Sequence, residues 1–338
     1  MNLRELAGKL DLSQTTVSRA LNGFPEVSEA TRARVRAAAE QFGYRPSPAA
    51  RRLATGRSGT IGLVFPAERN MLGDLLFTEF LGGCVERAGD LGHEITLSMV
   101  RGGQSEETVY RRAVRSARVD AMILSSPLIE DARPGLLRQL GVPFIVHGRT
   151  RSTEPYAFLD IDNEGGFRAA TRLLLDLGHR RIALVNGERQ LNFAADREHG
   201  FLGALGERGV AVPADFIVSD PMHETTGLVR ASRLLAQEGP PTAFLASSIG
   251  QALGIARAVR ERGLGIGREV ALIAHDDRLH DLRGENFDPP LTTTQSSIGD
   301  AGRRIIELCI AALLENGELP QEVWPVDLVV RQSTMPAQ

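Results

Sequence analysis

The sequence predicts two folds in one chain: an all-α head of helix-turn-helix type with a hinge helix, and an α/β body of two lobes with parallel sheets. Three observations lead to this prediction. Cationic residues concentrate in the first 57 positions, three capped helical segments occupy the same stretch, and strands alternate with amphipathic helices in two successive blocks after residue 60. With 338 residues, the chain is also long enough for more than one domain.

Charge is divided unevenly along the chain. Up to Arg57 there are ten Lys and Arg residues against five Asp and Glu residues, which gives this segment a net charge of +5. The whole chain carries -3, so the remainder carries -8. A basic segment on an acidic body is typical of a nucleic-acid-binding arm joined to a separate globular unit. A solvated charged face would give the same counts, so charge alone does not decide between the two.

Capping residues place three helices in the head. Side-chain oxygens that can cap helix N-termini are supplied by Asn2, Ser13 and Ser28. The first helix runs to Leu10, with Glu5 as the reciprocal partner of its cap, and the second runs to about Leu21. The third ends at Gly43, because glycine adopts the left-handed conformation of a helix stop.

The first two helices are joined by a turn of three residues, which predicts a helix-turn-helix domain whose second helix enters the major groove of DNA. In that helix Val17, Ala20 and Leu21 face inward. The side chains left outside are Gln14, Thr15, Ser18 and Arg19. Gln and Arg can form bidentate hydrogen bonds to base edges, and Ser can donate a hydrogen bond to a phosphate. The alternative at this point is a small, solvent-exposed helical bundle.

A very short helix is predicted after the head. Ser47 is its N-cap, residues 49–54 can form barely two turns, and Gly56 begins a linker. Such a helix would fray alone in water, because nucleation is costly and no packing supports it. Leu53 has no core of its own there, and apolar wedges of this kind insert between base steps in a minor groove.

Motifs of the head and hinge resemble those of the lactose-repressor/galactose-repressor family of bacterial transcription factors. They are LSQTTVSRALNG, VSEATRARV and YRPSPAARRLATG, and the resemblance extends over the whole chain. One departure is Asp11, where the family usually has Gly in the turn. Asp tolerates the left-handed region, so we expect the turn to form.

The resemblance implies a periplasmic-binding-protein-like body and a homodimer bound to palindromic, double-stranded operator DNA. It implies that Gln14, Thr15 and Arg19 read bases. It also implies contacts to the DNA backbone from Ser13, Thr16, Ser18, Asn22 and Ser28, and minor-groove contacts from Ala50 and Leu53. The sign of regulation stays open, since an effector that prefers the DNA-bound form co-represses and one that prefers the other form induces. Repressor and activator roles at individual promoters are likewise open.

The body divides into two similar blocks of strands and helices, which predicts two lobes with a cleft between them. The expected domains are a DNA-binding domain at 1–46, a hinge helix and linker at 47–59, and an effector-binding and dimerisation domain at 60–338. Within the last, the expected lobes are about 60–160 with 291–319, and about 161–290 with 320–332.

Ligands of open α/β sheets bind at the carboxyl ends of the strands. Residues at predicted strand ends are Phe65, Pro66, Ser125, Ser126, His147, Arg149, Asn186, Ser247, Ser248, His275, Asp276 and Asp277. Carboxylates, Arg and small hydroxyls fit a sugar, whose hydroxyl groups both donate and accept hydrogen bonds. Taken singly, Asp277, Asn163 and Ser125 fit loop caps equally well.

The candidate effector-binding residues are His147, Arg149, Arg197, Ser247, Ser248 and Asp276. By resemblance, Arg197 and Asp276 fall where the family has an effector-contacting Arg and Asp. Many members carry Asn-Asp at the place of Ser247-Ser248, so the two serines would act with shorter side chains or through water. Segments such as VHGR and AHDD resemble those of repressors of α-glucoside operons. The expected effector is therefore a sugar or α-glucoside.

Other classes of function are less consistent with the sequence. A solute-binding transporter component would share the body but needs a secretory signal, and an α/β enzyme needs a phosphate loop or metal-binding set. The glycines at 263–267 follow a predicted helix rather than a strand, which argues against a dinucleotide site. We therefore expect a protein without catalytic activity, cofactor or metal. We also expect it to be cytoplasmic, without a membrane span. Cys84 and Cys309 should be buried thiols.

Overall fold

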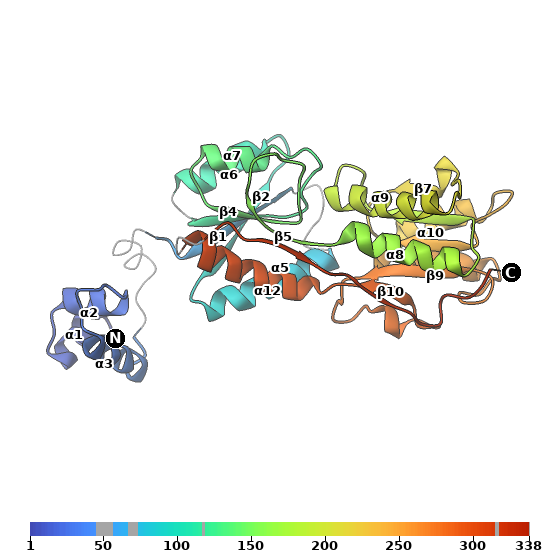
Figure 1. The fold of residues 1–338 in the computed structure, drawn as a ribbon. Coiled ribbons are helices and arrows are strands. Elements are labelled where there is room, and N and C mark those ends of the chain that lie inside the picture. The colour runs from blue at the N-terminus through green and yellow to red at the C-terminus, as the bar shows by residue number, and fades with distance from the viewer. Residues whose placement is uncertain (45–56, 67–73, 117–118, 315–317, 338) are drawn as a thin grey trace.

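The computed structural model describes residues 1–44, 57–66, 74–116, 119–314 and 318–337, and all structural statements below refer to these residues (Figure 1). The predicted hinge helix, including Ala50 and Leu53, lies outside them. None of the helices in the described ranges is long and apolar enough to cross a membrane.

The head consists of three helices, as predicted: α1 (Leu3–Leu10), α2 (Gln14–Leu21) and α3 (Glu29–Gln41). Asn2 and Glu5 form a reciprocal capping box at the start of α1. The turn between α1 and α2 places Asp11 in the left-handed region at φ 51°, so the expected tolerance of Asp is confirmed. The three helices share a small core that includes Leu6, Val17 and Val35, all fully buried.

The first lobe is a parallel sheet with helices on both faces. Its strands are β1 (Thr60–Pro66), β2 (Glu94–Val100), β3 (Ala121–Leu124), β4 (Phe144–His147), β5 (Ala157–Ile161) and β11 (Gln321–Trp324). They lie in the order β11-β5-β4-β3-β1-β2. The helices are α5 (Leu75–Asp90), α6 (Glu106–Arg115), α7 (Arg133–Gln139) and α12 (Ile298–Leu308), the last continuing into a π-helical segment at Cys309–Leu314.

The second lobe repeats this architecture. Its strands are β6 (Ile182–Asn186), β7 (Ile217–Ser219), β8 (Ala243–Ala246), β9 (Ala271–Asp276), β10 (Thr292–Gln295) and β12 (Asp327–Val329), in the order β12-β10-β9-β8-β6-β7. Only the pairing of β12 with β10 is antiparallel among these described strands. The helices are α8 (Asn163–Asp176), α9 (Asn192–Glu207), α10 (Glu224–Leu234) and α11 (Ile249–Glu261), with short 3-10 turns at Ala214–Phe216 and Gly284–Asn286.

Over the described residues the chain passes between the lobes three times, and two of these crossings differ from the prediction. Strand β10 was expected in the first lobe but pairs with β9 in the second. Strand β11 was expected in the second lobe but pairs with β5 in the first. The later crossings therefore lie between β10 and α12 and between β11 and β12, because backbone pairing with distant strands decides the sheet to which each short strand belongs.

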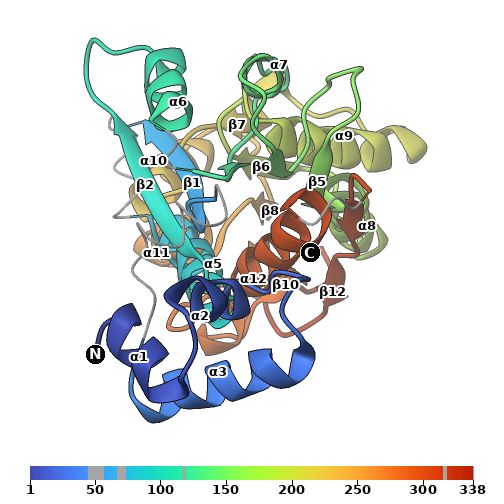
Figure 2. The same ribbon diagram turned by 90° about the vertical axis from the view of Figure 1, so that its left-hand side faces the viewer.

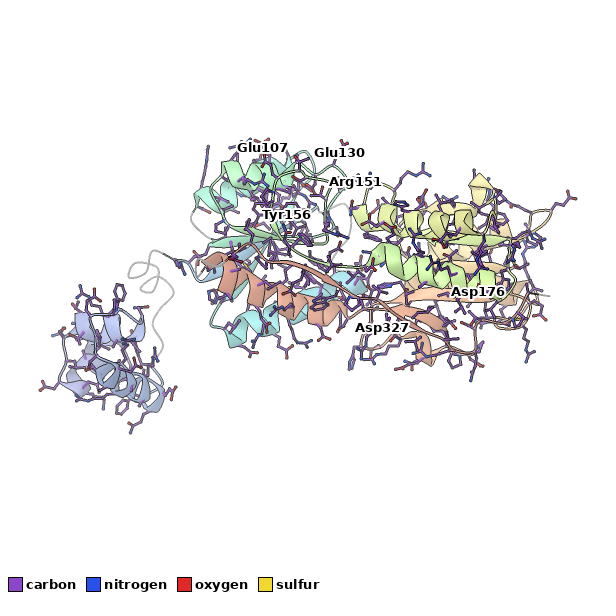
Figure 3. All side chains as sticks on the ribbon, viewed as in Figure 1. Glu107, Glu130, Arg151, Tyr156, Asp176 and Asp327 are labelled. Atoms are coloured by element: carbon purple, nitrogen blue, oxygen red, sulfur yellow. The ribbon has the colours of Figure 1, made fainter. Side chains whose placement is uncertain are left out.

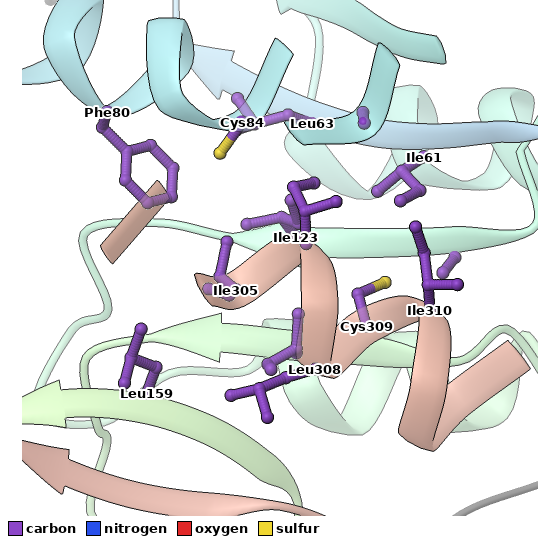
Figure 4. Packing of buried hydrophobic residues seen from close by; sticks show 14 of the residues in the cluster. Ile61, Leu63, Phe80, Cys84, Ile123, Leu159, Ile305, Leu308, Cys309 and Ile310 are labelled. Carbon is purple, nitrogen blue, oxygen red and sulfur yellow. The ribbon is translucent and has the colours of Figure 1, made fainter. Parts of the chain in front are cut away.

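Helices α5 and α12 lie side by side on one face of the first sheet (Figure 1, Figure 2). Their backbones approach so closely that a methyl group at Gly302 would lie 2.2 Å from the carbonyl oxygen of Phe80. Around this contact the helices and strands form one buried cluster (Figure 4). Cys84 and Cys309 belong to it as buried free thiols, as predicted, and burial raises the pKa of the Cys309 thiol to about 12.

Candidate functional site

Within the described head, the residues predicted to contact DNA lie on the outer face of α2 and at the caps of α2 and α3. Gln14, Thr15 and Arg19 are exposed, as are the caps Ser13 and Ser28. Those partly buried are Thr16, Ser18 and Asn22. The Ser13 hydroxyl accepts the Thr16 backbone N–H at 3.0 Å, and the Ser28 hydroxyl accepts the Thr31 backbone N–H at 3.3 Å. The remaining free N–H groups at these two helix N-termini are suited to phosphate oxygens.

Two arginines of the head form hydrogen bonds to backbone carbonyl groups within the head itself. Arg34 donates to the carbonyl of Leu10 at 2.8 Å, and Arg32 donates to the carbonyl of Val27 at 2.9 Å. These bonds hold α3 against the rest of the head. The charge count of the sequence therefore overstates the number of cations in the described head that are free for DNA.

A cavity of about 510 Å³ lies between the two lobes. The carboxyl ends of β3, β4, β6, β8 and β9 point toward it, which agrees with the expected position of a ligand in open α/β sheets. Apolar side chains, including Phe77 and Phe80, cover its first-lobe side. Its volume lies within the range of ordinary small-molecule sites, roughly 300–1,000 Å³.

Arg197 projects from α9 into this cavity. It is only 4% exposed, and its guanidinium lies between the rings of Phe167 and Phe193, 4.8 Å from each centroid. Its Nε donates to Asn163 Oδ1 at 2.8 Å and its Nη1 donates to the carbonyl of Ser247 at 2.7 Å. Burial lowers the pKa of Arg197 to about 10, so the side chain stays charged at neutral pH.

Ser247 also lines the cavity, whereas Ser248 does not. The Ser247 hydroxyl donates to Asn186 Oδ1 at 2.6 Å. Asn186 does not line the cavity itself but orients the Ser247 hydroxyl. The Ser248 hydroxyl accepts the backbone N–H of Gln251 at 3.1 Å. Ser248 is thus the N-cap of α11, and the structure assigns it a local role in place of the predicted effector contact.

His147 and Arg149, two of the expected effector contacts, line the cavity from the first lobe. The His147 ring stacks on Phe80 at 4.3 Å, and burial lowers the pKa of His147 to about 4. Arg149 is held by an ion pair, with its Nε 2.6 Å from Asp160 Oδ2. Burial raises the pKa of Asp160, and the neighbouring Arg149 guanidinium opposes that rise.

Asp276, the last residue of β9, and Asp277, which follows it, have the opposite roles to those expected. Both carboxylate oxygens of Asp276 accept backbone N–H groups, from Arg278 at 2.8 Å and from Gly284 at 2.9 Å. Asp276 therefore anchors its own loop and does not line the cavity. Asp277, which fitted a loop cap equally well, lines the cavity instead.

Two other strand-end candidates are structural. His275 is 1% exposed, and its ring nitrogens lie 3.0 Å from the hydroxyls of Thr294 and Ser296. Phe65 is buried against Phe77 in the core of the first lobe. By contrast, Ser125 and Ser126 line the cavity.

Aromatic residues line the cavity although the sequence analysis did not predict them, and so do the carboxylates Asp74, Asp160 and Glu188. Phe193 lies four residues before Arg197 on α9, a spacing that places both on one helix face and could have indicated their stacking. Phe80 lies on α5, far from His147 in sequence, and no local pattern connects the two.

The lobes also contact each other directly at the cavity. Leu128 of the first lobe forms an antiparallel bridge with Leu191 of the second. The flanking backbone bonds are Ile129 N–H to Gln190 O at 3.0 Å and Asn192 N–H to Pro127 O at 3.1 Å. Movement of one lobe away from the other would break these bonds.

Two family profiles match the chain. Residues 2–47 match the family described as bacterial regulatory proteins, lacI family, and residues 171–334 match a periplasmic binding protein-like domain. Among curated proteins, the HTH-type transcriptional regulator AglR of Rhizobium meliloti (strain 1021) is 45% identical over 100% of this chain and 95% of its own. The HTH-type transcriptional regulator RafR of Escherichia coli is 36% identical over 96% of this chain and 94% of its own.

Solved structures agree with these matches. The lac repressor dimer bound to operator and the anti-inducer ONPF superposes with a TM-score of 0.79 at 26% identity, covering 99% of both chains. The complex of the transcriptional regulator CelR with cellobiose gives a TM-score of 0.73 at 26% identity, covering 99% of this chain and 100% of that one.

Proposed function

We propose that this chain, which belongs to the lacI family of bacterial regulatory proteins, binds a palindromic operator as a homodimer. A sugar-like effector, held between the two lobes, controls this binding. The observation that carries this proposal is the joint presence of a helix-turn-helix head and an interlobe cavity in which Arg197 and Asp277 offer a donor and an acceptor. A hydroxyl group satisfies both.

Relatives support each half of the proposal. AglR and RafR are named as transcriptional regulators, and the similar lac repressor structure is a dimer bound to operator. The similar CelR structure holds cellobiose. A sugar, with α-glucosides first among the candidates, is therefore the effector we propose for this chain, and regulation of a carbohydrate-utilisation operon is its role.

In the head, we assign base reading to Gln14, Thr15 and Arg19, whose side chains are exposed on α2. Backbone contacts are assigned to Ser13, Thr16, Ser18, Asn22 and Ser28. Ala50 and Leu53 remain predictions for the minor groove. The proposed domains are 1–46 for DNA binding, 47–59 for the hinge and linker, and the remainder for effector binding and dimerisation.

In the cavity, we assign effector contacts to His147, Arg149, Arg197, Ser247 and Asp277. The chain would act by binding and not by catalysis, as a regulator does, and in the cytoplasm where bacterial DNA is held. Repression is the proposed sign of regulation, in keeping with the repressor names among its relatives.

Retention of genomic DNA fragments by the purified chain, followed by sequencing, tests the proposal. We expect a small set of fragments that share a palindrome, and a change in their retention when maltose, sucrose or raffinose is added. A sugar that binds should also raise the melting temperature of the protein. Retention without sequence preference, or a pattern that no sugar alters, contradicts the proposed function.

A further inference from the structure

We propose that the interlobe cavity is selective for an uncharged, polyhydroxylated effector and excludes phosphorylated or carboxylated forms of the same molecule. This inference rests on the proposed function, because it specifies the chemical class of the effector for the same cavity. It is carried by the charges on the cavity wall and by the partners that those charges already have.

Acidic side chains outnumber cationic ones on the described wall. The carboxylates are Asp74, Asp160, Glu188 and Asp277, and the cations are Arg149 and Arg197. With histidines neutral, this part of the wall has a formal charge of -2. His147 adds no positive charge at neutral pH, since burial lowers its pKa to about 4. Because the cavity is partly desolvated, an entering anion meets repulsion that water screens poorly.

Both wall arginines already have anionic neighbours. The Arg149 guanidinium is paired with Asp160 at 2.6 Å, and the charges of Asp277 and Asp160 act on Arg197. The bonds of Arg197 to other described residues use Nε and Nη1, which leaves Nη2 as a donor for a ligand oxygen. To form an ion pair with Arg149, a phosphate would have to displace Asp160. To form one with Arg197, it would have to overcome the repulsion from Asp277.

Asp277 gives the wall an acceptor that suits hydroxyl groups. Its side chain is 13% exposed, and its Oδ1 lies 3.4 Å from Nε2 of His275. Burial and the charge of Arg197 both lower the pKa of His275, so this neighbour is neutral. An ionised carboxylate only accepts hydrogen bonds, so it binds a donor. A sugar hydroxyl can donate to Asp277 and accept from Arg197, whereas a phosphate dianion can only accept.

Apolar groups complete the fit to a neutral molecule. Phe77, Phe80 and Ile298 line the first-lobe side of the cavity, and Phe193 and Met222 line the opposite side. These surfaces suit the C–H faces of sugar rings, and the few polar groups between them orient the hydroxyls.

Titration calorimetry on the full-length chain compares neutral sugars with their phosphate esters. The pairs are maltose and maltose 6'-phosphate, sucrose and sucrose 6-phosphate, and glucose and glucose 6-phosphate. We expect each neutral sugar that binds to do so at least tenfold more tightly than its ester, which corresponds to about 1.4 kcal/mol. An ester that binds as tightly as its sugar, or more tightly, overturns the inference. Failure of every probe contradicts the proposed function and removes the inference that rests on it.

The variant Asp277→Asn tests the assigned cause. Removing this charge should weaken binding of the neutral sugar and reduce the sugar-to-ester ratio at least threefold. Asp281→Asn is the matched control, because this side chain is 95% exposed and outside the cavity, and its ratio should equal that of the wild type. Glu188→Gln serves as a second variant if Asp277→Asn does not fold. Unchanged ratios in the cavity variants overturn the assignment.

Discussion

Replacing Arg197 with methionine should weaken sugar binding about 10–150-fold while leaving the chain folded. The guanidinium is the buried donor of the cavity, and its Nη2 is available to a ligand oxygen. A hydrogen bond from a charged donor contributes about 1.5–3 kcal/mol, and every 1.4 kcal/mol changes affinity about tenfold. Methionine keeps an unbranched apolar chain between the flanking aromatic rings but cannot donate.

The effect on stability follows from opposing contributions. The variant loses the bonds to Asn163 and Ser247, about 1.5–3 kcal/mol each, and a cation–π contact of about 0.5–2 kcal/mol with Phe167 and Phe193. It also removes a buried charge: burial lowers the pKa of Arg197 to about 10, well below its usual value, so removal of the charge relieves on the order of 3 kcal/mol. We therefore expect a net destabilisation of about 0.5–5 kcal/mol.

Urea unfolding measures the stability, and calorimetry with the tightest neutral sugar measures the affinity. Arg208→Met is the matched control, because Arg208 forms a surface ion pair with Asp176 at the end of α8 in the second lobe, where such pairs contribute about 0–1 kcal/mol (Figure 3). Wild-type sugar affinity in Arg197→Met, or an equal loss in the control, would refute the assigned role.

Three further predictions concern the head, the cavity and the core. Arg19→Ala and Gln14→Ala should each reduce the preference for the operator over other DNA by about 1–3 kcal/mol in competition binding, while non-specific binding is retained. Full selectivity in both variants would exclude α2 as the helix that reads the bases. Because the folded pKa of His147 is about 4, below its unfolded value near 6.5, the stability from its neutral form is complete above about pH 6.5 and is lost as pH falls toward 4. Because His147 is partly exposed, the loss should stay below about 3 kcal/mol. Urea titrations of His147→Asn should show a flatter pH profile, and an identical profile contradicts this. Gly302→Ala should destabilise the chain by about 1–3 kcal/mol or more through its clash with α5, whereas Gly82→Ala, with no atom near the added methyl, should be neutral or stabilising in the same assay.

Features governed by neighbouring residues could be predicted from the sequence. The caps at Asn2, Ser13 and Ser28 act on backbone groups within three residues, so the three head helices were placed correctly. The alternation of strands and helices predicted two parallel sheets for the same reason.

Features governed by distant contacts could not be predicted in this way. Asp276 and Asp277 are adjacent and chemically identical, and only the backbone N–H of Gly284, eight residues beyond Asp276, shows which one is the anchor. Likewise, β10 and β11 are four residues each, and their partners β9 and β5 decide the sheets to which they belong. The stacking of Phe80 on His147 depends on the packing of α5 over the sheet.

A neutral sugar in the interlobe cavity should change the affinity of the head for its operator. Fluorescence anisotropy of labelled operator, titrated with wild type and Leu53→Ala at saturating sugar and without it, tests this most directly. We predict a change of about 5–150-fold in the wild type and a smaller change in Leu53→Ala, with equal sugar affinity of the two DNA-free proteins. Operator affinity of the wild type that stays the same at saturating sugar would contradict this coupling between cavity and head.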